Sequence, residues 1–369
     1  MADSSNKELL YARIRANPYL SQQELADSLG LSRSAVAGHI AALIRERRLL
    51  GRAYVLPDRR PIVCIGAANL DRKLRSLAPL AMGTSNPARA DESFGGVARN
   101  IAENLARLGA PVALMTAVGL DAAGAALLAH AAEAGIDTGA TLTLPDTCSG
   151  TYTAVLGGGG ELVVALADMG LYEQLTPAYL DTRATLRAQA AMVVADLNLP
   201  HDTVAALIDA AGRDQVALVI VSVSVPKMDR LPASLHGVRL AILNEAELAA
   251  RVGHAPASDL AFAAACRTLQ DQGARDVVVT RGALGVIYTT PDGITHLPAP
   301  KAEPVDVTGA GDAFAAAVCF TLNQDGDDLA LACRRGLELS ALTLACRQTV
   351  CPTLSPDTFR PHAAPLLQD

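Results

Sequence analysis

Tryptophan is absent from this sequence of 369 residues, and aromatic residues together make up only 3% of it. The composition therefore offers little material for a pocket that stacks a large aromatic ligand. No uninterrupted apolar run approaches about 18 residues, the length that a membrane-spanning helix needs. The first residues, MADSSNKELL, also lack the apolar core of a secretory signal peptide. The sequence thus predicts a globular protein without a transmembrane helix.

Cysteine motifs typical of metal sites are missing as well. Seven cysteines are scattered through mostly apolar segments, and the nearest pair, Cys346 and Cys351, has no second pair to complete a site. Buried thiols are the simpler interpretation. An odd number of cysteines, with no signal peptide, predicts a cytoplasmic location.

The charge is unevenly distributed along the chain. The net charge is −7, yet residues 1–60 hold ten Lys or Arg against six Asp or Glu. At this length two or more domains are expected. A basic first segment followed by an acidic body predicts two parts with different partners.

The segment SQQELADSLGLSRSAVAGHIAALIRERRLL, residues 21–50, predicts two short helices joined by a tight turn. Ser21 can cap the first helix, with Glu24 at the capping-box position, and Gly30 can end it. Ser32 can cap the second helix, which carries an apolar stripe. This pattern is typical of a helix-turn-helix unit.

Residues 1–57 as a whole resemble a winged helix-turn-helix domain of bacterial regulators, with RRLLGRAYVL, residues 47–56, as a two-stranded wing. DNA binding is favoured over a helical packing or dimerisation module, because the basic residues lie where the wing should be. Two residues of the second helix and two of the wing would contact DNA: Arg33, Ser34, Arg48 and Arg52.

From residue 61 to about residue 360, apolar strands alternate with helical segments. Continuous apolar strands such as residues 191–198 and 216–224 predict a mainly parallel sheet covered by helices on both faces. A ligand of such a sheet should lie at the carboxyl ends of the strands.

Two stretches interrupt this alternation. Residues 82–94 are polar and irregular, and residues 150–167 predict two strands around a glycine-rich turn. A small β-lid inserted into the α/β body, formed by about residues 68–95 and 148–168, would explain both.

The stretch DVTGAGDAF, residues 306–314, combines bare backbone, a helix start and an acid. Gly309, Ala310 and Gly311 would expose N–H groups at the positive end of a helix dipole, which is an anion site. Asp312 beside such a site would repel the anion, so its presence there indicates a chemical task. Removing the proton from a hydroxyl that attacks a phosphate is such a task. The sequence therefore predicts phosphoryl transfer to an alcohol.

The longer string DVTGAGDAFAAAV closely resembles the C-terminal signature of the ribokinase-like, or PfkB, family of carbohydrate and nucleoside kinases. The resemblance extends over nearly all of residues 61–360. It implies a three-layer α/β/α sandwich with a β-lid, and ATP and Mg²⁺ as cofactors. It also implies four catalytic residues: Gly309, Ala310, Gly311 and Asp312.

Other motifs follow in the family's order. NLD after the first strand and GGVARN before a helix resemble the family's substrate-binding segments. Each motif alone would be an ordinary strand end or helix cap, and the two lid threonines could equally be plain exposed residues. The resemblance implies these substrate-binding residues: Asn69, Asp71, Gly95, Gly96, Asn100, Thr151, Thr153 and Asp168.

NEAE and TRGALG match the family's Asn-x-x-Glu motif and its Thr-x-Gly-x-x-Gly turn near the ATP phosphates. By itself NEAE is an unremarkable helix start. The resemblance implies that Asn244, Thr280, Gly282 and Gly285 bind ATP. The cation ligands it implies are Glu247, Asp306 and Thr308.

One segment departs from the family pattern. Residues 347–355, RQTVCPTLS, replace a Gly-Ala that many members have before the last loop, in a region that often completes a monovalent-cation site. The sequence therefore leaves dependence on K⁺ open.

The segments GGVARNIAENLARLG, TYTAVLGGGGELVVALADM and TVCPTLSP are most similar to pseudouridine kinases, some of which carry an N-terminal winged helix. This similarity implies the 5′-hydroxyl of pseudouridine as acceptor, and the scarcity of aromatic residues favours a small base or simple sugar. Another nucleoside, a pentose or a hexose remains open. A transcription regulator that uses the body as a ligand sensor is the alternative class, although the retained Asp312 favours catalysis. Homodimers joined through their lids are expected from the resemblance.

Overall fold

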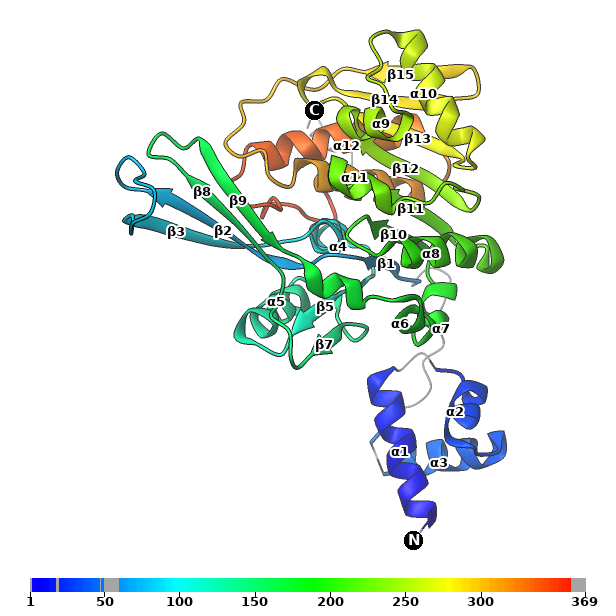
Figure 1. The fold of residues 1–369 in the computed structure, drawn as a ribbon. Helices are drawn as coiled ribbons and strands as arrows, with labels where there is room; N and C mark the ends of the chain where they lie inside the picture. The colour runs from blue at the N-terminus through cyan, green and yellow to red at the C-terminus, as the bar shows by residue number, and fades with distance from the viewer. Residues whose placement is uncertain (1, 18–19, 47, 50–59, 360–369) are drawn as a thin grey trace, which may run out of the picture.

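The computed structural model describes residues 2–17, 20–46, 48–49 and 60–359. Figure 1 shows a small helical bundle beside a larger α/β body. The part of the chain that is described contains no helix long and apolar enough to cross a membrane.

Among the described residues of the N-terminal bundle there are three helices: α1 (Ala2–Ala16), α2 (Gln22–Leu29) and α3 (Arg33–Arg45). The predicted capping box is confirmed, because the Ser21 side chain accepts from the Glu24 N–H and the Glu24 carboxylate accepts from the Ser21 N–H at 2.7 Å. Gly30 ends α2 with a left-handed φ of 63°, and Ser32 caps α3. Local sequence thus sets both ends of the turn.

Buried aliphatic side chains from all three helices form a core of their own, which includes Leu10, Leu25, Val36 and Leu43. The predicted helix-turn-helix arrangement is therefore observed. The predicted wing lies outside the described residues, apart from residues 48 and 49, as does Arg52.

A nine-stranded sheet forms the centre of the body, in the order β15-β14-β13-β12-β11-β10-β1-β4-β6. The pairs from β6 through β1 to β13 are parallel, as predicted, whereas β14 and β15 run antiparallel at one edge. The strands are β1 (Ile62–Ile65), β4 (Val112–Met115), β6 (Ile136–Asp137), β10 (Met192–Asp196), β11 (Ala217–Val221), β12 (Val238–Asn244), β13 (Asp276–Thr280), β14 (Val286–Thr290) and β15 (Gly293–Leu297).

Helices cover both faces of this sheet, which gives the predicted three layers. Alternate residues of each strand point to opposite faces: Ile62 and Cys64 share a core with one set of helices, and Val63 and Ile65 share a core with the other. The first set is α4 (Val97–Arg107), α5 (Ala122–Glu133), α11 (Ala310–Gln324) and α12 (Leu329–Leu344). The second set is α6 (Pro177–Asp181), α7 (Ala184–Ala188), α8 (His201–Asp214), α9 (Glu245–Val252) and α10 (Asp259–Asp271).

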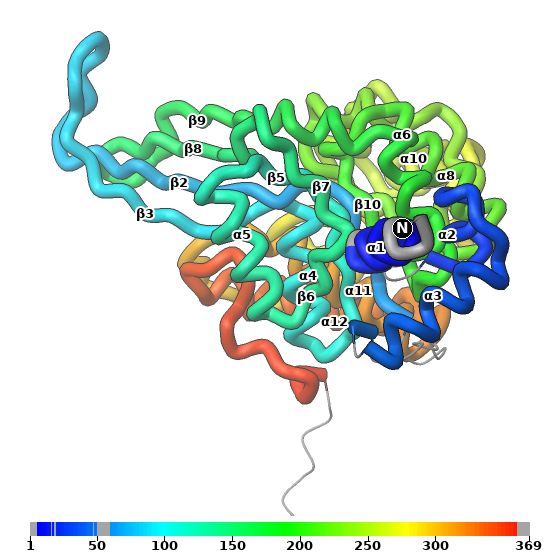
Figure 2. The backbone as a smooth tube through the Cα atoms, turned by 90° about the horizontal axis from the view of Figure 1, so that it is seen from below, coloured from blue at the N-terminus to red at the C-terminus, as the bar shows by residue number. Residues whose placement is uncertain are grey.

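A second sheet of four strands, in the order β3-β2-β8-β9, projects to one side of the body (Figures 1 and 2). We call this sheet the lid. Its strands are β2 (Asn69–Ser76), β3 (Ala88–Gly95), β8 (Thr151–Leu156) and β9 (Leu162–Asp168). Most of the segment that the sequence presents as irregular, residues 82–94, is therefore a regular strand.

Short elements complete the body. A two-stranded sheet joins β5 (Ala117–Gly119) to β7 (Leu142–Leu144). The described part of the body also contains the short 3₁₀ helices η2 (Gly170–Gln174), η3 (Val225–Arg230) and η4 (Gly282–Leu284). The η4 turn follows the carboxyl end of β13, so it lies at the edge of the sheet where ligands of α/β proteins bind.

Candidate active site

The first component of the site is the start of helix α11. Gly309 precedes the helix with a left-handed φ of 84°, and a Cβ atom on it would lie 2.1 Å from the Thr349 carbonyl oxygen. Only glycine fits this position. Within the described residues no side chain caps α11, and the Ala310 N–H reaches only the Val307 carbonyl, at 3.5 Å. The first N–H groups of the helix are therefore available to an anion.

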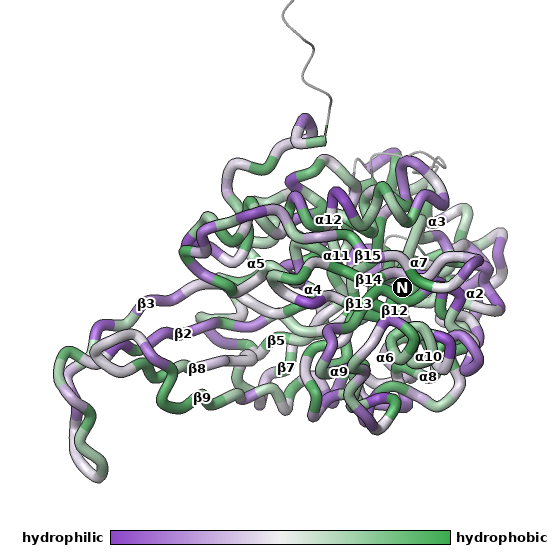
Figure 3. The backbone as a smooth tube through the Cα atoms, turned by 90° about the horizontal axis from the view of Figure 1, so that it is seen from above, coloured by the Kyte–Doolittle hydropathy of each residue, from purple (hydrophilic) through white to green (hydrophobic). Residues whose placement is uncertain are grey.

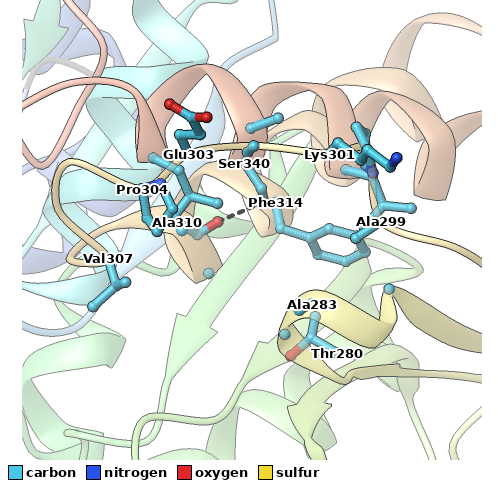
Figure 4. Close-up of a pocket in the computed structure, with 18 residues that line it drawn as sticks. Thr280, Ala283, Ala299, Lys301, Glu303, Pro304, Val307, Ala310, Phe314 and Ser340 are labelled. Carbon is cyan, nitrogen blue, oxygen red and sulfur yellow. Dashed lines mark hydrogen bonds between the residues drawn. The ribbon is translucent and has the colours of Figure 1, made fainter.

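A cavity of about 950 Å³ lies beside this helix start (Figure 4). Thr280 and Ala283 face Ala310 and Ser340 across the cavity, and the Ser340 hydroxyl donates to the Ala310 carbonyl at 2.8 Å. The cavity has the size of a small-molecule site. It brings together five residues that the sequence assigns to phosphate or ATP binding: Thr280, Gly282, Gly285, Ala310 and Gly311.

Asp312 lies in the first turn of α11 and contacts the first turn of α4. Its Oδ2 accepts a hydrogen bond of 2.7 Å from the Asn100 Nδ2. Burial raises the pKa of Asp312 to about 7, and Asp196 and Asp71 act in the same direction, whereas the hydrogen bond from Asn100 and the charge of Arg99 lower it. A carboxyl with a pKa near neutrality suits a general base.

Asp71 forms the second acidic position, at the base of the lid. Its Oδ1 accepts from the Asn69 Nδ2 at 2.6 Å, and a Cβ on Gly95 would lie 2.1 Å from its Oδ2. Burial raises the pKa of Asp71 to about 6. Gly96 follows with a φ of 98°. The structure thus places a carboxylate directly against bare backbone, an arrangement that can receive hydroxyl groups.

Asp196, at the carboxyl end of β10, holds the loop after β1 and the start of α4 in place. Its carboxylate accepts from the backbone N–H groups of Ala67, Ala98 and Asn198 at 2.8–2.9 Å. The carboxylate therefore caps α4 and fixes the loop after β1. Burial raises the pKa of Asp196, and these three donors offset part of the cost of burying it.

Lys73, on lid strand β2, reaches the loop that leads into α11. Its Nζ forms an ion pair with Asp306 and lies 3.4 Å from the Thr308 Oγ1. The other oxygen of Asp306 accepts from the Thr308 N–H at 2.9 Å and from its hydroxyl at 2.7 Å. The side chains of Asp306 and Thr308 are thus bonded to each other and to the lid.

The NEAE motif forms a capping box at the start of α9. The Asn244 side chain accepts from the Glu247 N–H at 2.9 Å, and the Glu247 Oε2 accepts from the Asn244 N–H at 2.7 Å and from the Ser222 hydroxyl. Glu247 is only 3% exposed. Across the described ranges, no group of three or more His, Cys, Asp or Glu side chains could hold a metal ion.

The lid register separates three predicted substrate contacts from Asp71. Asp71 pairs with Tyr152, whereas Thr151 pairs with Leu70 and Thr153 with Arg72. Asp168 pairs with Thr151. Because paired residues of neighbouring strands point to the same face, Thr151, Thr153 and Asp168 lie on the face opposite Asp71. Tyr152 is the residue of β8 that pairs directly with Asp71 on its own face of the lid, and no sequence motif indicates it.

The predicted DNA contacts of the bundle are only partly available. Arg33 and Ser34 are exposed at the start of α3. The Arg48 guanidinium donates to both oxygens of Glu8, at 2.5 and 2.8 Å, and lies 4.1 Å from the centre of the Tyr11 ring. Arg48 would therefore have to exchange Glu8 for a phosphate.

Comparison with known families agrees with this geometry. Residues 59–355 match the family described as pfkB family carbohydrate kinase, and residues 4–47 match the winged helix-turn-helix DNA-binding family. Two of the similar curated proteins are from Escherichia coli K12. The uncharacterised sugar kinase YeiI is 32% identical over 96% of this chain and 97% of its own length. The pseudouridine kinase is 33% identical over 80% of this chain and 93% of its own length.

Solved structures give the same fold. A carbohydrate kinase from Agrobacterium tumefaciens superposes with a TM-score of 0.70 at 34% identity, over 81% of this chain and 95% of that one. A ribokinase from Arabidopsis thaliana, complexed with ribose and ATP, has a TM-score of 0.69 at 20% identity, over 80% of this chain and 96% of that one. The predicted ribokinase-like sandwich with an N-terminal winged helix-turn-helix domain is confirmed.

The contact at Gly309 leads to a test. Gly309→Ala should lower the free energy of unfolding by about 2–4 kcal/mol, because the new Cβ meets the Thr349 carbonyl at a left-handed φ. Thermal or urea unfolding measures the change. Gly311→Ala is the matched control, since a Cβ there meets nothing within 4 Å. Equal effects of the two substitutions would contradict this account of the helix start.

Proposed function

This chain belongs to the pfkB family of carbohydrate kinases, and we propose that it transfers the γ-phosphate of ATP to the 5′-hydroxyl of pseudouridine. The observation that carries the chemistry is the contact of Asp312 with Asn100 at the anion-binding start of α11. A carboxyl with a pKa near 7 can accept the hydroxyl proton, and the free N–H groups of α11 beside a cavity of about 950 Å³ can hold a phosphate, as phosphoryl transfer uses them. The E. coli pseudouridine kinase supports the choice of acceptor.

The residues would act in the following way. The acceptor lies over Gly95 and Gly96, with sugar hydroxyls on Asp71. Asp312 takes the proton of the attacking hydroxyl as its oxygen bonds to the γ-phosphorus and the bond to ADP breaks. The N–H groups of Ala310 and Gly311 stabilise the charge that develops on the phosphoryl oxygens.

Magnesium would enter with the nucleotide and neutralise its phosphates. Glu247 is buried and bonded within its capping box, so the ligands of the ion would be mainly phosphate oxygens and water. A K⁺ ion near Asp306 and Thr308 would depend on backbone carbonyls, since both side chains are already bonded.

The first test is ATP consumption with pseudouridine, uridine, adenosine, inosine, ribose and fructose as acceptors. We expect turnover with pseudouridine. Asp312→Asn should lower kcat by roughly 10²–10⁴-fold, the usual contribution of a general base. Turnover of wild-type protein confined to another acceptor would replace the substrate and keep the mechanism. Tight binding of one compound without turnover of any would favour the ligand-sensor alternative.

The same assay has a predicted pH dependence. Asp312 must be ionised to accept a proton, and its pKa is raised to about 7. We therefore expect kcat/KM to fall about tenfold per unit as the pH drops below about 7. A profile that stays flat down to pH 5 would exclude Asp312 as the base.

We also propose that the N-terminal bundle binds DNA through α3. The match of residues 4–47 and the exposure of Arg33 at the start of α3 support this. Arg33→Ala should weaken binding of the protein to its own promoter region and reduce its salt dependence, as measured by fluorescence anisotropy. The control is Arg267→Ala, on an exposed arginine of α10. Absence of measurable binding by the wild-type protein would contradict the proposal.

A homodimer joined through the lids is the third proposal. Strand β9 carries exposed apolar side chains, with Leu166 64% exposed, and much of it is coloured as hydrophobic in Figure 3. Leu166→Glu should convert a dimer into a monomer, as measured by light scattering after gel filtration. Leu260→Glu is the control, because Leu260 is 81% exposed on α10, away from the lid. A wild-type monomer would refute this proposal.

A further inference from the structure

A buried ion pair on α4 has no part in the chemistry described so far. Arg99 is 2% exposed and Glu103 is 3% exposed, and they form an ion pair one turn apart on the helix. On the solvent side, the Arg107 Nη2 lies 2.8 Å from the Glu103 Oε1. Burying charged groups is costly, and replacing a buried ion pair by apolar residues is often neutral or stabilising. A role in the site would explain why the pair lies there.

Arg99 reaches the site through the residue next to it. Its Nη1 donates to the Asn100 Oδ1 at 2.7 Å and to the Phe94 carbonyl at 2.5 Å. The Asn100 Nδ2 in turn donates to the Asp312 Oδ2 at 2.7 Å. The four side chains of Glu103, Arg99, Asn100 and Asp312 therefore form a continuous polar chain from the helix interior to the candidate base.

The chemistry of the end groups determines how the Asn100 amide is oriented. A guanidinium only donates and an ionised carboxylate only accepts, whereas an amide has one donating and one accepting end. Only one orientation of Asn100 satisfies both neighbours. Without Arg99, the Asn100 Oδ1 would lose its donor, and the amide could rotate away from Asp312.

We propose that Arg99, held by Glu103, is a positioning residue for phosphoryl transfer. Arg99 fixes the Asn100 amide so that its Nδ2 donates to the Asp312 Oδ2. The Asp312 Oδ1 is then left to accept the proton of the acceptor hydroxyl. The bond to the Phe94 carbonyl also fixes the backbone immediately before Gly95, where the acceptor would lie. This inference rests on the proposed kinase function.

The charge of Arg99 adds an electrostatic effect to this positioning. Three charged groups on three elements act on Asp312: Asp196 at the end of β10 and Asp71 on β2 raise its pKa, and Arg99 on α4 lowers it. Lys73 on β2 is paired with Asp306 instead. Burial lowers the pKa of Arg99 itself to about 10, so it remains charged at neutral pH. Its removal should raise the pKa of Asp312 further.

The test compares Arg99→Met and Arg99→Lys with the matched control Arg107→Met, which removes the less buried partner of the same Glu103. On whichever acceptor the wild-type protein uses, Arg99→Met should lower kcat roughly 10²-fold, the cost of a small misplacement. It should also move the acid limb of the pH profile up by about one unit. Arg99→Lys should return the acid limb of the pH profile to its wild-type position, because an ammonium keeps the positive charge. It should not restore kcat, because an ammonium lacks the planar set of donors that binds both Asn100 and the Phe94 carbonyl. Arg107→Met should leave the limb in place.

A second measurement does not depend on turnover. The Asp312 carboxyl can be titrated by ¹³C NMR in the free protein, with Asp312→Asn to assign its signal. Arg99→Met should titrate at higher pH than the wild-type protein and Arg107→Met. If no acceptor is phosphorylated, the kinase proposal fails, and this titration still tests the contact of Arg99 with the site. An Arg99→Met protein that is folded and has wild-type titration and pH profile would overturn the inference, even if its melting temperature were lower.

Discussion

The hydrogen bond between Asn100 and Asp312 joins two helix starts that are 212 residues apart in the sequence. It is possible because α4 and α11 cover the same face of the central sheet. The start of α4 contacts Asp196 at the end of β10, and the start of α11 shares the cavity with Thr280 at the end of β13. The sheet order fixes which helices are neighbours, and each helix then supplies one polar residue from its first turn. The candidate base is therefore positioned by the packing of the fold, and not by its own loop.

Around this contact the site is built from close approaches of backbone. Gly309 lies against the Thr349 carbonyl, Gly95 against the Asp71 carboxylate, and Gly96 against the Ala67 carbonyl, each closer than a Cβ atom would allow. Such contacts bring N–H groups and carboxylates to a ligand without intervening side chains. They also explain why these few glycines were enough to locate the candidate site in the sequence.

Sequence reasoning succeeded where local chemistry decides the structure. The capping box of Ser21 and Glu24 depends on four consecutive residues, and it could be predicted from them. Features that depend on tertiary contacts could not be predicted from the sequence. The alternating strand TYTAVL indicates two faces but not which one meets the ligand, so the strand register was needed to place Tyr152 beside Asp71. Arg99 and Glu103 have the spacing of an ordinary surface pair, and only their burial distinguishes them.

The two buried carboxyl groups of the site, Asp71 and Asp312, lower the free energy of unfolding as the pH rises. Burial raises the pKa values of Asp71 and Asp312 above the ordinary carboxyl value, to about 6 and about 7. The folded state therefore binds these two protons more tightly than the unfolded state, and the resulting stabilisation is complete only below about pH 4. It is lost as the pH rises through 6 and 7, the range in which Asp312 becomes able to accept a proton. The ionisation that makes Asp312 a base is thus the one that the fold opposes. Asn100 and Arg99 reduce that opposition because both favour the charged form of Asp312.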